Sequence, residues 1–198
     1  MAFIEDGAGT GKRAKVNKAN KLKTDSTTHS QALDANIDGD AYNINTGIIT
    51  LTNATETPII YVKNGEDKDM VVEAVVIGVF DSSDGDSTAN VTATFVRNPT
   101  AGTIVSGASA VAINSNRNYG SANTLSNSLA YKGATGNTMT DGDDHILVRI
   151  TENSRNFISI NEILPKGTAI GVKVKPPTSN TSMDVYVAVI CYLINGAD

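Results

Sequence analysis

Short stretches of apolar residues with a period of two recur between residues 48 and 194 and predict β-strands. Residues 168–175 are the clearest case, because Ile170, Val172 and Val174 alternate with glycine and lysine. Residues 70–80 are apolar at both alternating sets of positions, which predicts a central strand covered on both sides. The predicted strands are 48–52, 58–63, 70–80, 90–97, 110–113, 129–131, 145–150, 157–160, 168–175 and 183–194.

The arrangement of these segments predicts an all-β protein. Turn-forming pairs such as Asn64-Gly65 and Asn98-Pro99 end two of the strands. No stretch has a convincing helical period, and no repeat of fixed length is present. Roughly eight to ten strands must pair two sheets face to face, so the expected body is a β-sandwich or is jelly-roll-like.

Residues 1–40 lack the strand pattern. Their apolar residues are scattered, and Gly7, Gly9 and Gly11 add backbone freedom near the start. Such a segment buries too little apolar surface to offset the entropy of ordering it. We therefore expect an extended, flexible N-terminal arm at residues 1–40, with Phe3 and Ile4 as its apolar anchors, followed by a β-sandwich domain at residues 41–198.

Charge divides the chain in the same region. The whole chain has a formal net charge of −5, and residues 1–30 alone carry six basic and three acidic side chains. The first 30 residues are therefore at +3 and the other 168 at −8. The basic residues of the arm are Lys12, Arg13, Lys15, Lys18, Lys21 and Lys23.

The basic run has two interpretations. It could neutralise the phosphates of a nucleic acid, or lie on an acidic protein surface. No aromatic residue is interleaved with it, so stacking on bases is not supported. We expect a protein surface or simple solvation, and no specific nucleic-acid binding.

Residues 99–140 are rich in glycine, serine and asparagine, with short strand candidates only. A polar segment of this length is either an elaborate loop or a surface made for contact. The sequence leaves both options open.

Two kinds of motif resemble binding sites and fail on inspection. Gly7 to Lys12 departs from a phosphate-binding loop, because Arg13 follows the lysine and too few residues precede it to form a strand. Acidic loops at 38–40, 81–86 and 141–144 lack the spacing of an EF-hand and are typical of solvated turns.

The residues available for catalysis are few. Cys191 is the one cysteine, which excludes an intrachain disulfide, and its apolar surroundings predict a small buried hydrophobe. His29 and His145 have no Cys or His neighbour at metal-ligand spacing. We expect no catalytic residue, no metal and no cofactor. A carboxylate pair for glycoside hydrolysis stays open, although the absence of tryptophan disfavours a sugar cleft.

The chain shows no targeting segment or membrane span. Its start is too short and too acidic for a signal peptide. The longest nearly apolar run, 185–194, is about half of the ~20 residues that a spanning helix needs. We expect synthesis in a cytoplasm and no membrane partner.

Four segments together resemble virion structural proteins of tailed bacteriophages, many of which are head decoration (cement) proteins. The segments are 1–7 (MAFIEDG), 39–47 (GDAYNINTG), 116–120 (NRNYG) and 179–185 (SNTSMDV). The resemblance implies a non-enzymatic β-sandwich on the outer surface of a capsid, synthesised in the host cytoplasm. Its implied partners are the major capsid protein and further copies of itself, with a trimer as one option.

Within this resemblance the arm has a mechanical role. Residues 1–40 would order along capsid subunits and clamp them. A tail-fibre or receptor-binding protein is the main alternative, with residues 99–140 as its recognition loops. An enzyme such as a polysaccharide hydrolase is the second alternative, since a fold alone does not settle function.

Overall fold

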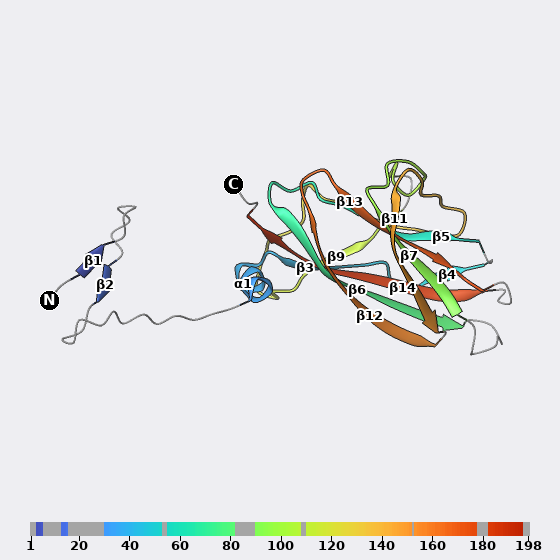
Figure 1. The fold of residues 1–198 in the computed structure, drawn as a ribbon, viewed down its shortest axis with the longest axis horizontal. Helices are drawn as coiled ribbons and strands as arrows, with labels where there is room; N and C mark the ends of the chain where they lie inside the picture. Colours follow the sequence, from blue (N-terminus) through green and yellow to red (C-terminus); the bar gives the residue numbers. More distant parts are fainter. Residues whose placement is uncertain are drawn as a thin grey trace. The chain divides into compact units, whose positions relative to one another are not determined.

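The computed structural model divides the chain into two compact units, Met1–Ser30 and Gln31–Asp198 (Figure 1). In the first unit, β1 (Phe3–Glu5) and β2 (Arg13–Lys15) form a two-stranded antiparallel ladder. The sequence predicted no strand there, because pairing through backbone hydrogen bonds needs no apolar periodicity. The structure describes residues 3–5, 13–15, 30–52, 55–81, 90–107, 110–151, 153–177 and 182–195.

The second unit is a sandwich of two six-stranded antiparallel sheets (Figure 1). The first, called the β13 sheet, has the order β11 (Asp143–Thr151), β7 (Asn90–Arg97), β13 (Ala169–Lys175), β5 (Thr57–Lys63), β10 (Leu129–Lys132), β8 (Ala110–Val111). The second, called the β14 sheet, has the order β12 (Ser154–Leu164), β6 (Asp69–Asp81), β14 (Met183–Ile194), β3 (Ala41–Asn45), β9 (Ile113–Asn116), with β4 (Ile49–Leu51) also paired to β14. The predicted all-β sandwich is confirmed.

The two sheets hold twelve strands, where roughly eight to ten were expected from the sequence pattern. One difference is that the expected strand at 110–113 divides between the sheets. Ala112, which is buried and donates its N–H to the Ala130 carbonyl, separates β8 from β9. Strand β3 was also missed, because a polar asparagine-rich pattern conceals its two inward residues, Tyr42 and Ile44.

A short helix, α1 (Gln31–Asp38), corrects the expectation that the chain has no helix. Ala35 is its buried residue, whereas Leu33 and Ile37 are exposed, so the sequence carries no apolar stripe at helical spacing. The helix ends at Gly39, whose φ of 77° lets the Gly39 and Asp40 N–H groups donate to the Asn36 and Ala35 carbonyls.

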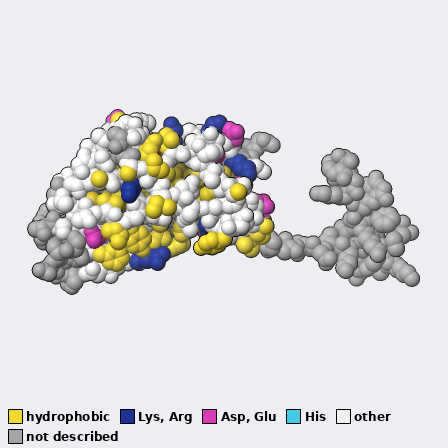
Figure 2. All heavy atoms as spheres, turned by 180° about the vertical axis from the view of Figure 1, so that it is seen from behind, with side chains coloured by type: hydrophobic (Ala, Val, Ile, Leu, Met, Phe, Trp, Pro, Cys, Tyr) yellow, Lys and Arg dark blue, Asp and Glu magenta, His cyan; other side chains and the backbone are white. Residues whose placement is uncertain are grey.

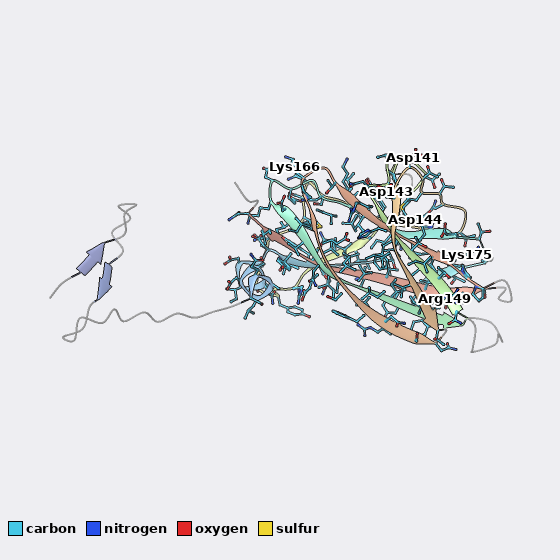
Figure 3. All side chains as sticks on the ribbon, in the orientation of Figure 1. Asp141, Asp143, Asp144, Arg149, Lys166 and Lys175 are labelled. Carbon is cyan, nitrogen blue, oxygen red and sulfur yellow. The ribbon has the colours of Figure 1, made fainter. Side chains whose placement is uncertain are left out.

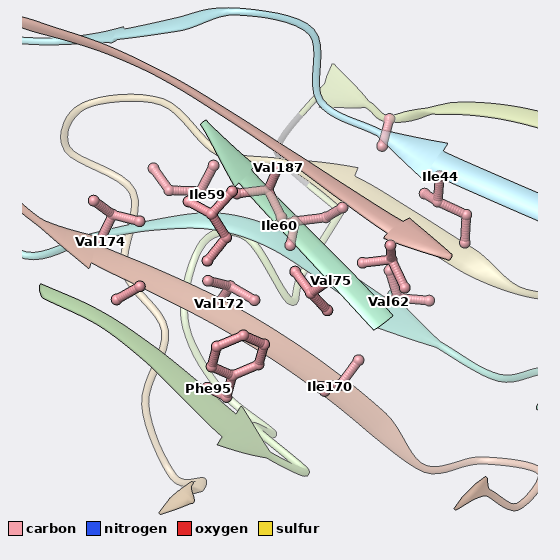
Figure 4. Packing of buried hydrophobic residues seen from close by; sticks show 14 of the residues in the cluster. Ile44, Ile59, Ile60, Val62, Val75, Phe95, Ile170, Val172, Val174 and Val187 are labelled. Carbon is pink, nitrogen blue, oxygen red and sulfur yellow. The ribbon is translucent and has the colours of Figure 1, made fainter. Parts of the chain in front are cut away.

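The core lies between the inward faces of the two sheets (Figure 4). Strand β13 contributes Ile170, Val172 and Val174, as its alternation predicted. Strand β6 is central in its sheet, between β12 and β14, as its continuous apolar run predicted. Phe95 of β7 is fully buried beside the β13 residues. Removal of these side chains from water is the main stabilising term of the sandwich.

A second, smaller core covers the outward face of the β13 sheet. Tyr61, Val96 and Ala169 point outward from β5, β7 and β13 and pack with Ile104 and Met139. Both covering residues come from the 99–140 segment, and Ala101 pairs with Thr140 in an isolated bridge. Part of this segment is therefore a cover for the β13 sheet.

Cys191 is expected to resist thiol reagents in the folded protein. It is 0% exposed in β14, in agreement with the sequence, and burial raises the pKa of its thiol to about 12, against a smaller opposite effect of Arg117. The stabilisation of the neutral thiol is complete below pH 9 and is lost as the pH rises toward 12. Titration with a chromogenic disulfide reagent at pH 8 should find no reactive thiol before unfolding and one after it. A Ser126→Cys variant, whose added thiol is exposed in a loop away from β14, is the positive control.

Candidate functional site

The residues predicted to bind a capsid lie in the first unit. Phe3 and Ile4 belong to β1, and Arg13 and Lys15 belong to β2. The ladder sets Phe3 opposite Lys15. The remaining predicted residues, which lie outside the described part of the chain, are Lys12, Lys18, Lys21 and Lys23.

The body has a cavity at the edge where β11 and β12, the outermost strands on one side of the two sheets, come together. Its volume is about 210 Å3. The floor is apolar, with Phe95, Ile170 and Leu164 contributing, and Arg97, His145 and Glu162 supply its charged groups. The cavity therefore combines an apolar interior with one cluster of titratable side chains.

That charged cluster joins the two sheets. His145 of β11 and Glu162 of β12 are in contact through Nε2 and Oε1. Arg97 of β7 places Nη2 at 3.3 Å from His145 Nε2 and 3.7 Å from Glu162 Oε1. In the tautomer with its proton on Nε2, the imidazole donates to the carboxylate, and the Arg97 guanidinium lies beside the same carboxylate. The sequence pattern did not indicate this pair, although residues 145 and 162 are nearly equidistant from Asn153 in the connection between β11 and β12.

The cluster connects β11 and β7 of one sheet to β12 of the other. None of its three side chains is a hydroxyl or thiol that could act as a nucleophile. Thr168 provides a hydroxyl at the cavity wall, but this hydroxyl donates to the Pro165 carbonyl at 2.7 Å. Nucleophilic catalysis needs a hydroxyl or thiol within reach of its base. The arrangement therefore supports holding β11 and β12 together at the open edge.

Two of the acidic loops each have one carboxylate paired with a lysine. Asp40 accepts from Lys68 Nζ at 2.5 Å, and Asp144 accepts from Lys173 Nζ at 2.9 Å. Asp143 and Asp144 stand at the start of β11, in the upper part of Figure 3. Among the described residues no group of three or more His, Cys, Asp or Glu side chains is placed to hold a metal ion.

Lys173 is the best-enclosed of these lysines, with a side chain 14% exposed. Burial by itself lowers its pKa, but the hydrogen bond that Lys173 donates to Asp144 and the charge of Glu56 outweigh this effect and raise the pKa above its usual value. This ion-paired lysine points outward from the β13 sheet, because it lies opposite Thr94 on the face away from Phe95.

The outward face of the β14 sheet is apolar across three strands, and we call these rows the β14 outer face. Opposed residues in an antiparallel sheet point to the same side, so the register defines the rows. The rows are Arg155–Gly78–Tyr186, Phe157–Val76–Ala188, Ser159–Ala74–Ile190 and Ile163–Val71–Tyr192. Beyond them, Phe80 pairs with Asp184 at one end and Asp69 pairs with Ile194 at the other.

Large side chains of the β14 outer face remain in contact with solvent. Phe157 is 64% exposed and Ile163 is 56% exposed. Tyr186 lies over Gly78, where a β-carbon would meet its ring, and it stacks on Phe80 with centroids 6.0 Å apart. A view of one side of the body shows hydrophobic side chains gathered into a large group with Lys or Arg side chains beside it (Figure 2).

Comparisons with known proteins find little. No protein-family model and no curated protein matches the chain. Among solved structures, the crystal structure of the Yersinia pseudotuberculosis-derived mitogen aligns over 79% of this chain and 89% of that chain, with 13% sequence identity and a TM-score of 0.32. A TM-score of this size carries no conclusion about function. No helix among the described residues is long and apolar enough to span a membrane.

Proposed function

We propose that this chain is a non-enzymatic structural protein of a phage particle that binds the outside of the capsid and stabilises it. The observation that carries the proposal is the division of the chain into two compact units of opposite charge. Residues 1–30 have a net charge of +3, and residues 31–198 have a net charge of −8. A small basic unit attached to an acidic sandwich suits a protein that is held on a larger assembly by its terminus.

In this function the N-terminal arm acts as the attachment device. Phe3 and Ile4 bury apolar surface against capsid subunits, while the basic residues between Lys12 and Lys23 pair with acidic groups on them. Each contact is weak, since ordering an arm costs entropy. Repetition over symmetry-related sites on the particle adds avidity to many weak contacts.

Deletion of residues 2–24 is expected to abolish particle binding and leave the body folded. The deleted segment holds both apolar anchors and all six basic residues of the arm. Binding is measured by cosedimentation with particles that lack the protein, and folding by circular dichroism and thermal unfolding. Full occupancy by the truncated chain contradicts the proposal.

A matched pair of variants separates the arm from general charge effects. Lys18→Glu with Lys21→Glu reverses two charges in the arm, and Lys132→Glu with Lys175→Glu reverses two on the body. The first pair is expected to weaken binding strongly and to reduce its salt dependence, because ion pairs are screened by salt. The second pair is expected to change binding little.

Copy number in purified particles is the first measurement to make. Quantitative mass spectrometry against the major capsid protein should give a simple ratio of many copies per particle. A few copies per particle would assign the chain to a tail or fibre, with residues 99–140 as recognition candidates. Absence from particles overturns the proposed function.

A further inference from the structure

We propose that the β14 outer face is a self-association interface, on which β12 of one copy lies across β12 of a second copy about a twofold axis. The inference goes beyond the proposed function, because it concerns free protein in solution and can be tested without a capsid.

The two outward faces of the sandwich differ in how far other parts of the chain cover them. The β13 sheet has its own cover, in which Ile104 and Met139 pack on Tyr61 and Val96. In the part of the chain that the structure describes, no second core of this kind forms on the β14 outer face. Antiparallel sheets with one solvated face usually carry polar residues on it. Strand β6 instead has Val71, Ala74 and Val76 on that side, and all three are buried. The side chains beside them on β12, Phe157 and Ile163, are largely exposed.

The exposed apolar residues of β12 are spaced so that two antiparallel copies of the strand would bring them into contact with each other. Phe157 and Ile163 lie three residues on either side of Ile160, and both side chains are largely exposed. A twofold axis through the middle of β12 places Phe157 of one copy against Ile163 of the other, and the reverse. Such an interface is isologous: the same patch serves both copies. Between the two, Ser159 and Asn161 are small enough to allow close approach.

Charge at the two ends of the face fits the same arrangement. Arg155 lies two residues before Phe157 on β12, and Asp69 lies two residues before Val71, which pairs with Ile163. The twofold operation therefore brings Arg155 of one copy near Asp69 of the other at each end. Nearer the middle, Glu73 pairs with Arg117 at 3.2 Å, so an opposite charge lies beside this carboxylate.

Pairing along the outer edge of β12, which pairs with no second strand among the described residues, is a different way to join two copies, and the backbone opposes it. Asn161 has a φ of 49°, and the register with β6 shifts between Ser159 and Glu162. A bulge of this kind interrupts the row of hydrogen-bonding groups that a new strand would need. The contact is therefore made by the face of the sheet.

The first test is the mass of the full-length chain in solution, by sedimentation equilibrium over a range of concentrations. The wild type is expected to be dimeric, and Phe157→Asp is expected to raise the dissociation constant by about 100-fold or more. Leu147→Asp is the matched control, because Leu147 is equally exposed, at 64%, and lies on β11 of the other sheet. A monomeric wild type, or equal effects of the two variants, overturns the inference.

The second test identifies the partner residue. Phe157→Cys mixed with Ile163→Cys should form a disulfide-linked dimer under mild oxidation. Cys191 is buried and should not form a disulfide. Phe157→Cys alone should not, since the two copies of residue 157 would lie about 20 Å apart. Arg155→Glu should weaken association, and adding Asp69→Lys should restore it. Cross-linking of each single variant as fast as the mixture, or no restoration, overturns the arrangement.

The inference and the proposed function fail separately. A dimer that does not bind particles leaves the interface standing and overturns the capsid role. A monomer that uses Phe157 to bind particles overturns the interface and leaves the capsid role.

Discussion

Replacement of Asn64 by alanine is expected to lower the free energy of unfolding by about 2–4 kcal/mol, since each buried carbonyl left without a donor costs about 1–3 kcal/mol. Asn64 is fully buried, and its Nδ2 donates to the Lys68 carbonyl at 2.9 Å and the Leu164 carbonyl at 2.8 Å. Its Oδ1 accepts from the Glu66 N–H at 3.0 Å. One side chain thus connects the end of β5 in one sheet to the end of β12 in the other.

Two further variants make the Asn64 result specific. Asn64→Asp keeps an acceptor for Glu66 and loses both donors, so it should destabilise at least as much as alanine. Asn43→Ala changes an incompletely buried asparagine on β3 and should cost well under 1 kcal/mol. Urea unfolding followed by circular dichroism measures all three. Equal small losses for Asn64→Ala and Asn43→Ala would show that the connection contributes little.

The strands that the sequence predicted are those whose apolar pattern is regular. The sequence of β13 alternates from Ile170 to Lys175, and β6 is apolar from Met70 to Phe80 apart from Glu73 and Gly78, so their core residues can be read from the sequence. β3 was missed because its inward Tyr42 and Ile44 are separated by asparagine in a polar context. Helix α1 was missed because it buries one alanine and is stabilised by its position against β14 and β3. Local pattern carries no information about such tertiary support.

The candidate sites were harder to predict from the sequence than the strands were. His145 and Glu162 are 17 residues apart and come from strands of different sheets, so their contact depends on how the sandwich closes. The β14 outer face was signalled in part, since residues 70–80 indicated a strand covered on both sides. The sequence does not specify what supplies the second cover, because an intramolecular layer and a second copy demand the same apolar residues.

Replacement of Phe95 by alanine is expected to lower the free energy of unfolding by about 3–5 kcal/mol, the usual cost of a large buried aromatic side chain. Phe95 is fully buried between the sheets and lies opposite Val172 of β13 and Ile146 of β11. Its removal leaves a cavity in the centre of the sandwich. Urea unfolding measures the loss, and a change below about 1 kcal/mol would contradict the packing, since it lies within the range of surface substitutions.

Phe157→Ala is the comparison that gives the Phe95 result its meaning. The same substitution at an exposed position should change the stability of the monomer by no more than about 0.5 kcal/mol. If a second copy covers Phe157, the midpoint of thermal unfolding of the wild type rises with protein concentration, because association stabilises the folded state by mass action. Phe157→Ala should remove most of that rise, whereas Phe95→Ala should lower the midpoint at every concentration. The two phenylalanines therefore separate the stability of the sandwich from the contact that we assign to its uncovered face.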